Sequence, residues 1–137
     1  MRTCISSGSP WEPRIGFSRA VRVGPWLAVS GTAPVAPDGG VAAPGDVRGQ
    51  TARCLEIIAR AVSEAGFDLT DVIRTRVMLT DITRWPEAAR AHGDMFGEVR
   101  PACTFVEVKG FIEPGWLVEV EADCVRPSAR DNSGEVR

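Results

Sequence analysis

The stretch VEVEADC, residues 118–124, decides the fold of this chain. Side chains of a β-strand point alternately to opposite faces of a sheet. Its three acidic side chains therefore share one face, and its small apolar side chains line the other. A second stretch, CTFVEV at residues 103–108, has a similar character. One face of the predicted sheet needs a hydrophobic cover, and the other needs water, cations or a partner subunit.

An amphipathic helix that can supply this cover is predicted over residues 47–65. Apolar residues recur there at spacings of three and four, which is the repeat of one helix face. Asp46 is placed to cap the first turn, and Gly66 is the kind of residue that commonly ends a helix.

A second, shorter helix is predicted over residues 86–97. Pro86 fits the first turn, because its fixed φ suits that position and its missing N–H would have no partner there. Ala89, His92 and Phe96 are expected along one side of this helix, which ends near Gly97.

An interior strand is predicted between the two helices, over residues 71–80. This segment is rich in β-branched residues and places Thr75, Val77 and Leu79 on one face. Residues 21–23 and 27–30 form a predicted hairpin. The order of strands and helices indicates a mixed α/β (α+β) sheet with both helices on its apolar face.

The composition fits one globular domain with its own core. The 137 residues are 44% hydrophobic and 25% charged, with a net charge of −2. A chain of this length needs no disulfide or structural metal to fold. The domain is expected over residues 1–126, and a polar, disordered tail is expected over residues 127–137. No segment has the character of a polybasic nucleic-acid face.

Cysteine and histidine usage argues against a metal site. The cysteines are widely separated, form no CxxC motif and are accompanied by a single histidine, His92. We expect reduced thiols and no metal ligand. The N-terminus is not a basic segment followed by an apolar run, and no stretch reaches the length of a membrane span. A soluble, cytoplasmic protein is therefore expected.

A series of short motifs follows in order along the chain. They are Ser30-Gly31, Gln50-Thr51, Ala65-Gly66, Asp71-Val72, Asp81, Arg100-Pro101-Ala102 and the strand 118–122. Their order and spacing, from about residue 16 to Arg126, resemble the reactive-intermediate deaminase family, also called Rid, YjgF-type or L-PSP endoribonuclease-like.

The resemblance implies a fold and an assembly. Members of the family look like chorismate mutase, with two helices on one face of a mixed sheet, and three subunits join their other faces into a trimeric barrel. The resemblance therefore implies a homotrimer. The polar strand faces would meet in it, and pairing between chains is expected among Arg74, Arg76, Glu107, Glu119 and Glu121.

The resemblance also implies an activity. Deaminases of the family hydrolyse small reactive imines and enamines to a carbonyl compound and ammonia, in clefts between subunits. The implied partner is therefore a small imine or enamine metabolite, with no metal and no organic cofactor. The residues themselves argue against a membrane and make a nucleic-acid partner unlikely. Positioning and a polarised water can supply most of the acceleration, because such intermediates are labile.

The chain departs from the family's Pro-Ala-Arg motif at Cys103. The arginine of that motif holds the substrate carboxylate in a fork that a thiol cannot form. Cys103 is a candidate catalytic group at the cleft, but packing is favoured because no cationic neighbour that would activate the thiol is evident. Arg100 is a candidate for the missing cation. The expected substrate lacks the usual carboxylate or has a larger hydrophobic body.

Two further positions carry over from the resemblance with a stated role. Glu119 matches the acid proposed to position the attacking water, and this catalytic reading competes about equally with a structural ion pair. Gly31 matches a glycine whose backbone lies close to the ligand.

Four aromatic or small residues complete the substrate-binding residues that the resemblance implies. Phe17 stands where many members have a tyrosine, so a ring is kept and a hydroxyl is lost. Trp85 matches an aromatic that lines the cleft from the neighbouring chain. Ala89 stands where asparagine is frequent, and Phe105 is also assigned to this set.

Two other functions stay open. A non-catalytic small-molecule binder or regulator would use the same clefts, and Cys103 favours it. A ribonuclease, an activity assigned to some family members, is less favoured because the chain carries a net charge of −2 and no basic patch.

Overall fold

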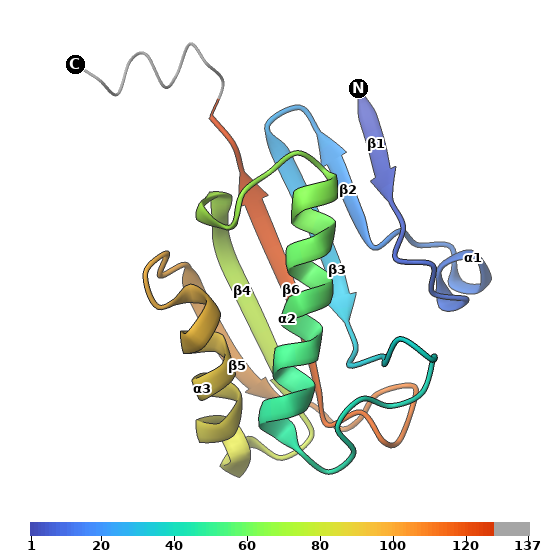
Figure 1. Ribbon diagram of the computed structural model, residues 1–137, viewed down its shortest axis with the longest axis vertical. Helices are drawn as coiled ribbons and strands as arrows, with labels where there is room; N and C mark the ends of the chain where they lie inside the picture. Colours follow the sequence, from blue (N-terminus) through green and yellow to red (C-terminus); the bar gives the residue numbers. More distant parts are fainter. Residues whose placement is uncertain (128–137) are drawn as a thin grey trace.

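The structure, a computed structural model, describes residues 1–127 and contains a six-stranded sheet (Figure 1). The strands lie in the order β1-β2-β3-β6-β4-β5. Neighbouring strands are antiparallel, except for β4 and β5, which are parallel. The predicted tail at residues 127–137 lies, apart from its first residue, outside the described residues.

The bounds of the elements follow the predicted order. The strands are β1 (Arg2–Ile5), β2 (Ala20–Val23), β3 (Trp26–Thr32), β4 (Val72–Leu79), β5 (Ala102–Glu107) and β6 (Val118–Val125). The helices are α1 (Trp11–Ile15), α2 (Val47–Glu64) and α3 (Trp85–Phe96), with short 3-10 turns η1 (Leu69–Asp71) and η2 (Ile82–Arg84).

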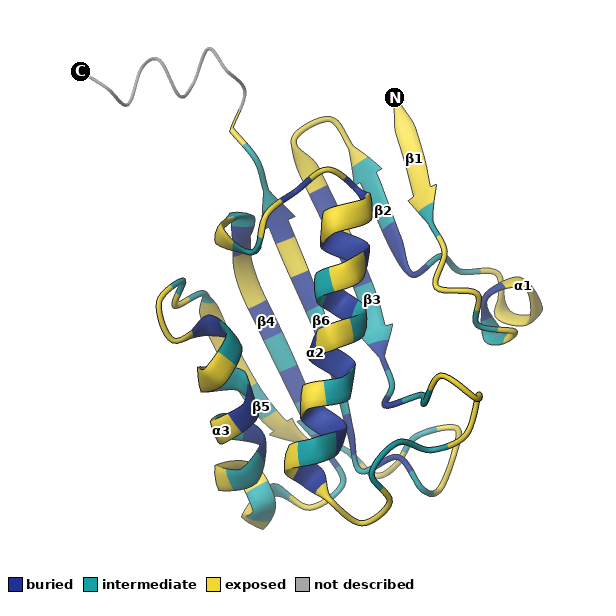
Figure 2. Cartoon of the chain, viewed as in Figure 1, coloured by how far each residue is buried: buried dark blue, intermediate teal, exposed yellow. Residues whose placement is uncertain are grey.

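Helices α2 and α3 cover one face of the sheet, as predicted (Figures 1 and 2). The alternation in β6 is confirmed, because Val118, Val120, Ala122 and Cys124 are buried beneath the helices while Glu119 and the residues of its face are less buried. The same alternation buries three residues of β4, namely Thr75, Val77 and Leu79.

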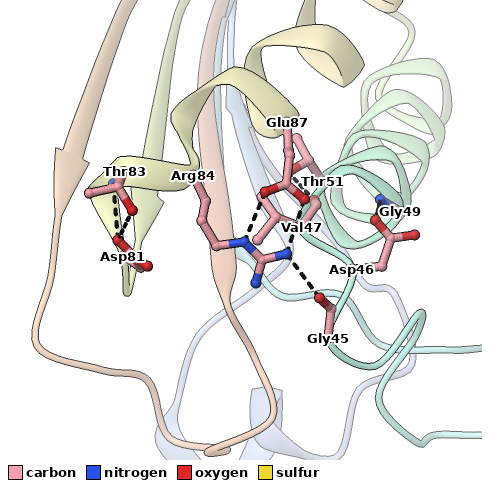
Figure 3. A network of polar contacts seen from close by, with 9 residues as sticks. All are labelled: Gly45, Asp46, Val47, Gly49, Thr51, Asp81, Thr83, Arg84 and Glu87. Carbon is pink, nitrogen blue, oxygen red and sulfur yellow. Dashed lines mark hydrogen bonds and ion pairs between the residues drawn. The ribbon is translucent and has the colours of Figure 1, made fainter.

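The ends of α2 are also as predicted. The side chain of Asp46 caps the helix by accepting a hydrogen bond of 3.0 Å from the N–H of Gly49 (Figure 3). Gly66 follows the helix with a φ of 85°, which side chains disfavour. The guanidinium of Arg84 donates to the carbonyl of Gly45 at 2.9 Å and also pairs with Glu87 (Figure 3). These contacts fix the start of α2 against the start of α3.

The buried side of α3 differs by part of a turn from the predicted one. Ala88, Ala91 and Phe96 are buried, whereas Ala89 and His92 are only half-buried. The sequence pattern alone does not distinguish one alanine from the next. The imidazole of His92 instead reaches the edge of the core.

The N-terminal segment holds two elements that the sequence did not predict. Strand β1 extends the hairpin by pairing with β2, and α1 lies beside the β1 edge (Figure 1). Neither element shows a periodic apolar pattern. Strand β1 is held by backbone pairing and is largely exposed. Backbone pairing leaves no trace in side-chain periodicity.

Arg76, for which pairing between chains is expected, also has a partner within its own chain. Arg76 forms an ion pair with Glu121 of the same chain, across the neighbouring strands β4 and β6. Both side chains are partly exposed, and they occupy adjacent register positions on the open face of the sheet. Cross-strand neighbours of opposite charge stabilise the pairing of their strands. Pairing between chains stays a prediction.

None of the helices in residues 1–127 combines the length and apolar character needed to cross a membrane. All four cysteines are free thiols, with Cys54 and Cys124 buried and Cys4 and Cys103 exposed.

Candidate functional site

A cavity of about 550 Å³ opens beside the end of β3. It is enclosed by the N-terminal segment, the end of β3, the outer side of α2 and the loops that follow β3 and precede β6. Three of the predicted site residues, Phe17, Gly31 and Glu119, line this cavity. The structure therefore brings together a ring, a glycine backbone and a carboxylate that lie far apart in the sequence.

Glu119 supplies the carboxylate of this site from β6. Its side chain points to the face opposite Val118 and Val120, and burial raises its pKa above the ordinary value while the charge of Arg19 opposes that rise. A carboxylate with a raised pKa is a better proton acceptor near neutral pH than an ordinary one. This property is the one that a general base needs.

Arg19, which the sequence analysis missed, lies in the wall of the cavity. Only 6% of its surface is exposed. Its Nη1 donates to the carbonyl oxygen of Gly31 at 2.7 Å and to Oγ1 of Thr32 at 3.0 Å. Its Nε donates to Oγ of Ser7 at 3.4 Å, and its guanidinium lies 5.3 Å from the ring centre of Phe17. Arg19 thus links the N-terminal segment to the end of β3.

The N-terminal segment carries a second buried charge, Glu12. Its Oε2 accepts hydrogen bonds from Oγ of Ser7 at 2.7 Å, from the N–H of Ser7 at 3.1 Å and from the N–H of Ser9 at 3.3 Å. Burial raises the pKa of Glu12, but these hydrogen bonds outweigh burial and lower it below the ordinary value. Glu12 is therefore held as a carboxylate, with Ser7 bridging it to Arg19.

The remaining walls of the cavity combine apolar side chains with charged ones from α2, namely Arg53, Glu56, Arg60 and Glu64. Trp11 and Ile15 come from α1, Ile57 comes from α2, and Ile112 and Trp116 come from the loop before β6. Such walls suit the hydrophobic body of a ligand, while a few polar groups orient it. The expected apolar character of a cleft between subunits stays a prediction.

The other predicted site residues lie at the opposite edge of the sheet. Trp85 and Ala89 are on α3, Arg100 follows that helix, and Cys103 and Phe105 are on β5. Figure 1 shows α3 and β5 at one edge of the sheet and α1 and β1 at the other edge. A single chain therefore does not bring these five residues to the cavity.

Each of these five residues has a defined local setting. Cys103 is an exposed free thiol on the edge strand, and Trp85 is 53% exposed. Arg100 is exposed, has a φ of 55°, and its N–H donates to the carbonyl of Phe96 at 2.8 Å. Phe105 packs against the core, with its ring centre 6.2 Å from that of His92.

Little in the sequence around Arg19 indicates that this side chain is buried. Arg19 directly precedes the apolar start of β2, at a place where a solvent-facing arginine would raise no question. Arginines are mostly exposed, so burial of this one follows only from the folded positions of its hydrogen-bond partners.

Comparison with known proteins assigns the family. Residues 9–126 match the family model described as Endoribonuclease L-PSP. The chain is similar to the crystal structure of Rv2704 from Mycobacterium tuberculosis, a member of the YjgF/YER057c/UK114 family. The TM-score is 0.82, the sequence identity is 44%, and the match covers 91% of this chain and 99% of that one. This chain belongs to the Rid/YjgF family.

Two sequence relatives differ in how similar they are to this chain. The protein SCO2049 of Streptomyces coelicolor is 38% identical over 122 residues, which is 89% of this chain and 90% of the relative. The 3-aminoacrylate deaminase RutC of Acinetobacter baylyi is 31% identical over 116 residues, which is 85% of this chain and 90% of the relative. Some members of the family thus carry the name of a deaminase that acts on an enamine acid.

Proposed function

We propose that this protein hydrolyses a small imine or enamine to a carbonyl compound and ammonia. The observation that carries the proposal is the position of Glu119, a carboxylate with a raised pKa in the wall of a cavity that also has apolar walls. Membership of a family that includes a named aminoacrylate deaminase supports the same reaction class.

The proposed reaction asks little covalent work of the protein. The carboxylate of Glu119 accepts a proton from water while the water oxygen forms a bond to the C=N carbon. The electron pair of the C=N bond moves to nitrogen, which takes up the proton that Glu119 accepted, so a carbinolamine forms and the carboxylate is restored. Glu119 then transfers the hydroxyl proton of the carbinolamine to its nitrogen. The C–N bond breaks with its electron pair on nitrogen, ammonia leaves, and the C=O bond of the product forms. An enamine first takes a proton on carbon to become the imine.

The proposed site is completed by a second subunit. Glu119, Gly31 and Phe17 lie at one side of the sheet, and the five other predicted residues lie at the opposite edge. A homotrimer in which α3 and β5 of one subunit meet the cavity of the next would unite the two groups. We propose this assembly, whose mass would be three times the 14.7 kDa of one chain. Trp85 would then contribute its exposed ring from the neighbouring subunit.

With Cys103 in place of the arginine of the family motif, the substrate must be held in another way. A thiol on β5 cannot supply the fork of an arginine, and truncating one partner of a buried charge pair costs about 2 to 5 kcal/mol. Either the substrate lacks the usual carboxylate, or another cation holds it. Arg100 is the cation closest in sequence, but its main chain is fixed at the end of α3 and its side chain is exposed.

The proposed activity is tested by the release of ammonia and keto acid from freshly generated 2-aminoacrylate and 2-iminobutyrate. We expect turnover by the wild type and a loss of about 100-fold or more in Glu119→Gln, since positioned general bases contribute about that much. Cys103→Arg, which places the arginine of the family's Pro-Ala-Arg motif in this chain, serves as the comparison. If only Cys103→Arg is active, the natural substrate of the wild type lacks the carboxylate. Equal rates for wild type and Glu119→Gln would contradict the proposed role of the acid.

A non-catalytic small-molecule binder is the second candidate function. The exposed thiol at Cys103, in place of an anion-fixing arginine, favours it. Binding of a metabolite in the cavity without any ammonia release, for wild type and Cys103→Arg alike, would support this function over the hydrolase.

A further inference from the structure

Arg19 is a buried cation with no direct carboxylate partner in the described part of the chain. The ion pairs within 4.0 Å among residues 1–127 do not include Arg19, although 94% of its surface is removed from solvent. Glu12 and Glu119 influence its charge only from a greater distance. Burial of an unpaired charge is costly, so a buried arginine normally has an anion beside it.

The donors of Arg19 are only partly used. Its Nη1 and Nε donate to the carbonyl oxygen of Gly31, to Thr32 and to Ser7. Nη2 has no hydrogen-bond acceptor within residues 1–127. In this part of the chain, every fully buried side-chain nitrogen or oxygen has a partner, so Nη2 is not fully buried. Nη2 is therefore in contact with open space. Since Arg19 lines the cavity, that space is the cavity itself.

The contacts of Arg19 also hold its guanidinium in one orientation. Two hydrogen bonds fix Nη1 to the end of β3, and Ser7 connects Nε to the carboxylate of Glu12. The ring of Phe17 lies against the guanidinium. An arginine fixed in this way loses little side-chain entropy when an anion arrives, which favours binding.

We propose that Arg19 binds the carboxylate of the ligand, in place of the arginine that is absent at Cys103. The ligands of the cavity are then carboxylic acids with an apolar body, which contacts Trp11, Ile57 and Trp116. The inference rests on the proposed function for its reaction class, but the binding step itself does not require turnover.

The alternative is that Arg19 only ties the N-terminal segment to β3. A purely structural arginine would give the cavity no preference for an acid over a neutral ligand of the same shape. The preference between such ligands therefore separates the two roles, whether or not the protein hydrolyses anything.

The test is a calorimetric titration with 3-phenylpropanoate and with its neutral amide, 3-phenylpropanamide. We expect the wild type to bind the acid about 10- to 100-fold more tightly, as charge-assisted hydrogen bonds allow. Arg19→Gln should lose this preference while keeping its affinity for the amide. Arg48→Gln, at an exposed arginine outside the cavity, is the matched control and should behave as the wild type.

Several results would overturn the inference. They are equal affinity of the wild type for acid and amide, an unchanged preference in Arg19→Gln, and loss of the preference in Arg100→Gln instead. If Arg19→Gln does not fold, Arg19→Lys takes its place, because lysine keeps the charge but lacks the separate Nη2 donor that faces the cavity. A weakened preference in Arg19→Lys supports the inference, and an undiminished one overturns it. Acid binding without any ammonia release would leave the inference standing and contradict only the proposed reaction.

Discussion

A Cβ atom added to Gly31 would lie 3.0 Å from Oε1 of Glu119. The glycine stands near the end of β3, where the register with β6 shifts between Val29 and Thr32. The absence of a side chain at this point lets the carboxylate lie against the backbone of the neighbouring strand. The position of Glu119 therefore depends on the residue facing it as well as on β6.

The first prediction concerns Gly31→Ala. The added methyl group should displace the carboxylate of Glu119 and lower turnover about 10- to 100-fold, because a shift of about 1 Å is enough to cost that much. The backbone of Gly31 is outside the left-handed region, so the fold should tolerate alanine. Gly110→Ala, where no atom lies within 4 Å of the new Cβ, is the matched control. Rates of ammonia release for the three proteins check the prediction, and an unaffected Gly31→Ala would refute it.

The second prediction concerns the pH dependence of stability in Glu119→Gln. Burial raises the pKa of Glu119, so the folded state holds its proton more firmly than the unfolded state. Between the ordinary pKa and the raised one, the contribution of Glu119 to wild-type stability therefore falls as pH rises. Glutamine does not titrate, so the variant does not lose stability in this way.

Urea denaturation of wild type and Glu119→Gln across pH 4 to 8 measures the effect. The free energy of unfolding of the wild type, minus that of the variant, should decrease as pH rises through the window that begins near 4.5. A difference that increases with pH would mean that the folded state prefers the ionised form, and Glu119 would then be a structural ion-pair partner.

The elements whose signals are local were predictable from the sequence. Asp46 and Gly66 mark the ends of α2 by their own chemistry, and the alternation of β6 is visible in its own residues. Glu119 and Gly31 were assigned through the family resemblance. Arg19 was missed because its burial depends on partners supplied by two other segments, and β1 was missed because it is held largely by backbone pairing.

The third prediction concerns His92, whose Nε2 lies 2.8 Å from Oγ1 of the fully buried Thr75. Burial lowers the pKa of His92 below 6.5. The folded state therefore binds fewer protons here than the unfolded state, and this site removes stability as pH falls below about 6.5. His92→Gln should lose less stability than the wild type between pH 7 and pH 5.5.

A direct measurement of the same shift is available because His92 is the only histidine. Its ring proton signals in an NMR titration need no further assignment. A midpoint below 6.5 is expected, and a midpoint above it would show that the imidazolium is stabilised in the folded state.

The fourth prediction concerns Gln50, a fully buried amide that joins α2 to the loop before β6. Its Nε2 donates to the carbonyl oxygen of Gly115 at 3.0 Å, and its Oε1 accepts from the N–H of Leu117 at 2.8 Å. Gln50→Met keeps the volume but leaves both backbone groups without partners. Each such group costs about 1 to 3 kcal/mol, so a loss of at least about 2 kcal/mol is expected.

The matched control for Gln50→Met is Glu56→Met, at an exposed position of the same helix, which should change stability by less than about 0.5 kcal/mol. Urea denaturation gives both values. The loop that Gln50 holds carries Trp116 into the cavity, so Gln50→Met should also weaken binding of an apolar ligand. A stability loss no larger than that of Glu56→Met would mean that water replaces the amide at both backbone groups. The wall of the cavity would then owe its position to packing of Trp116 rather than to Gln50.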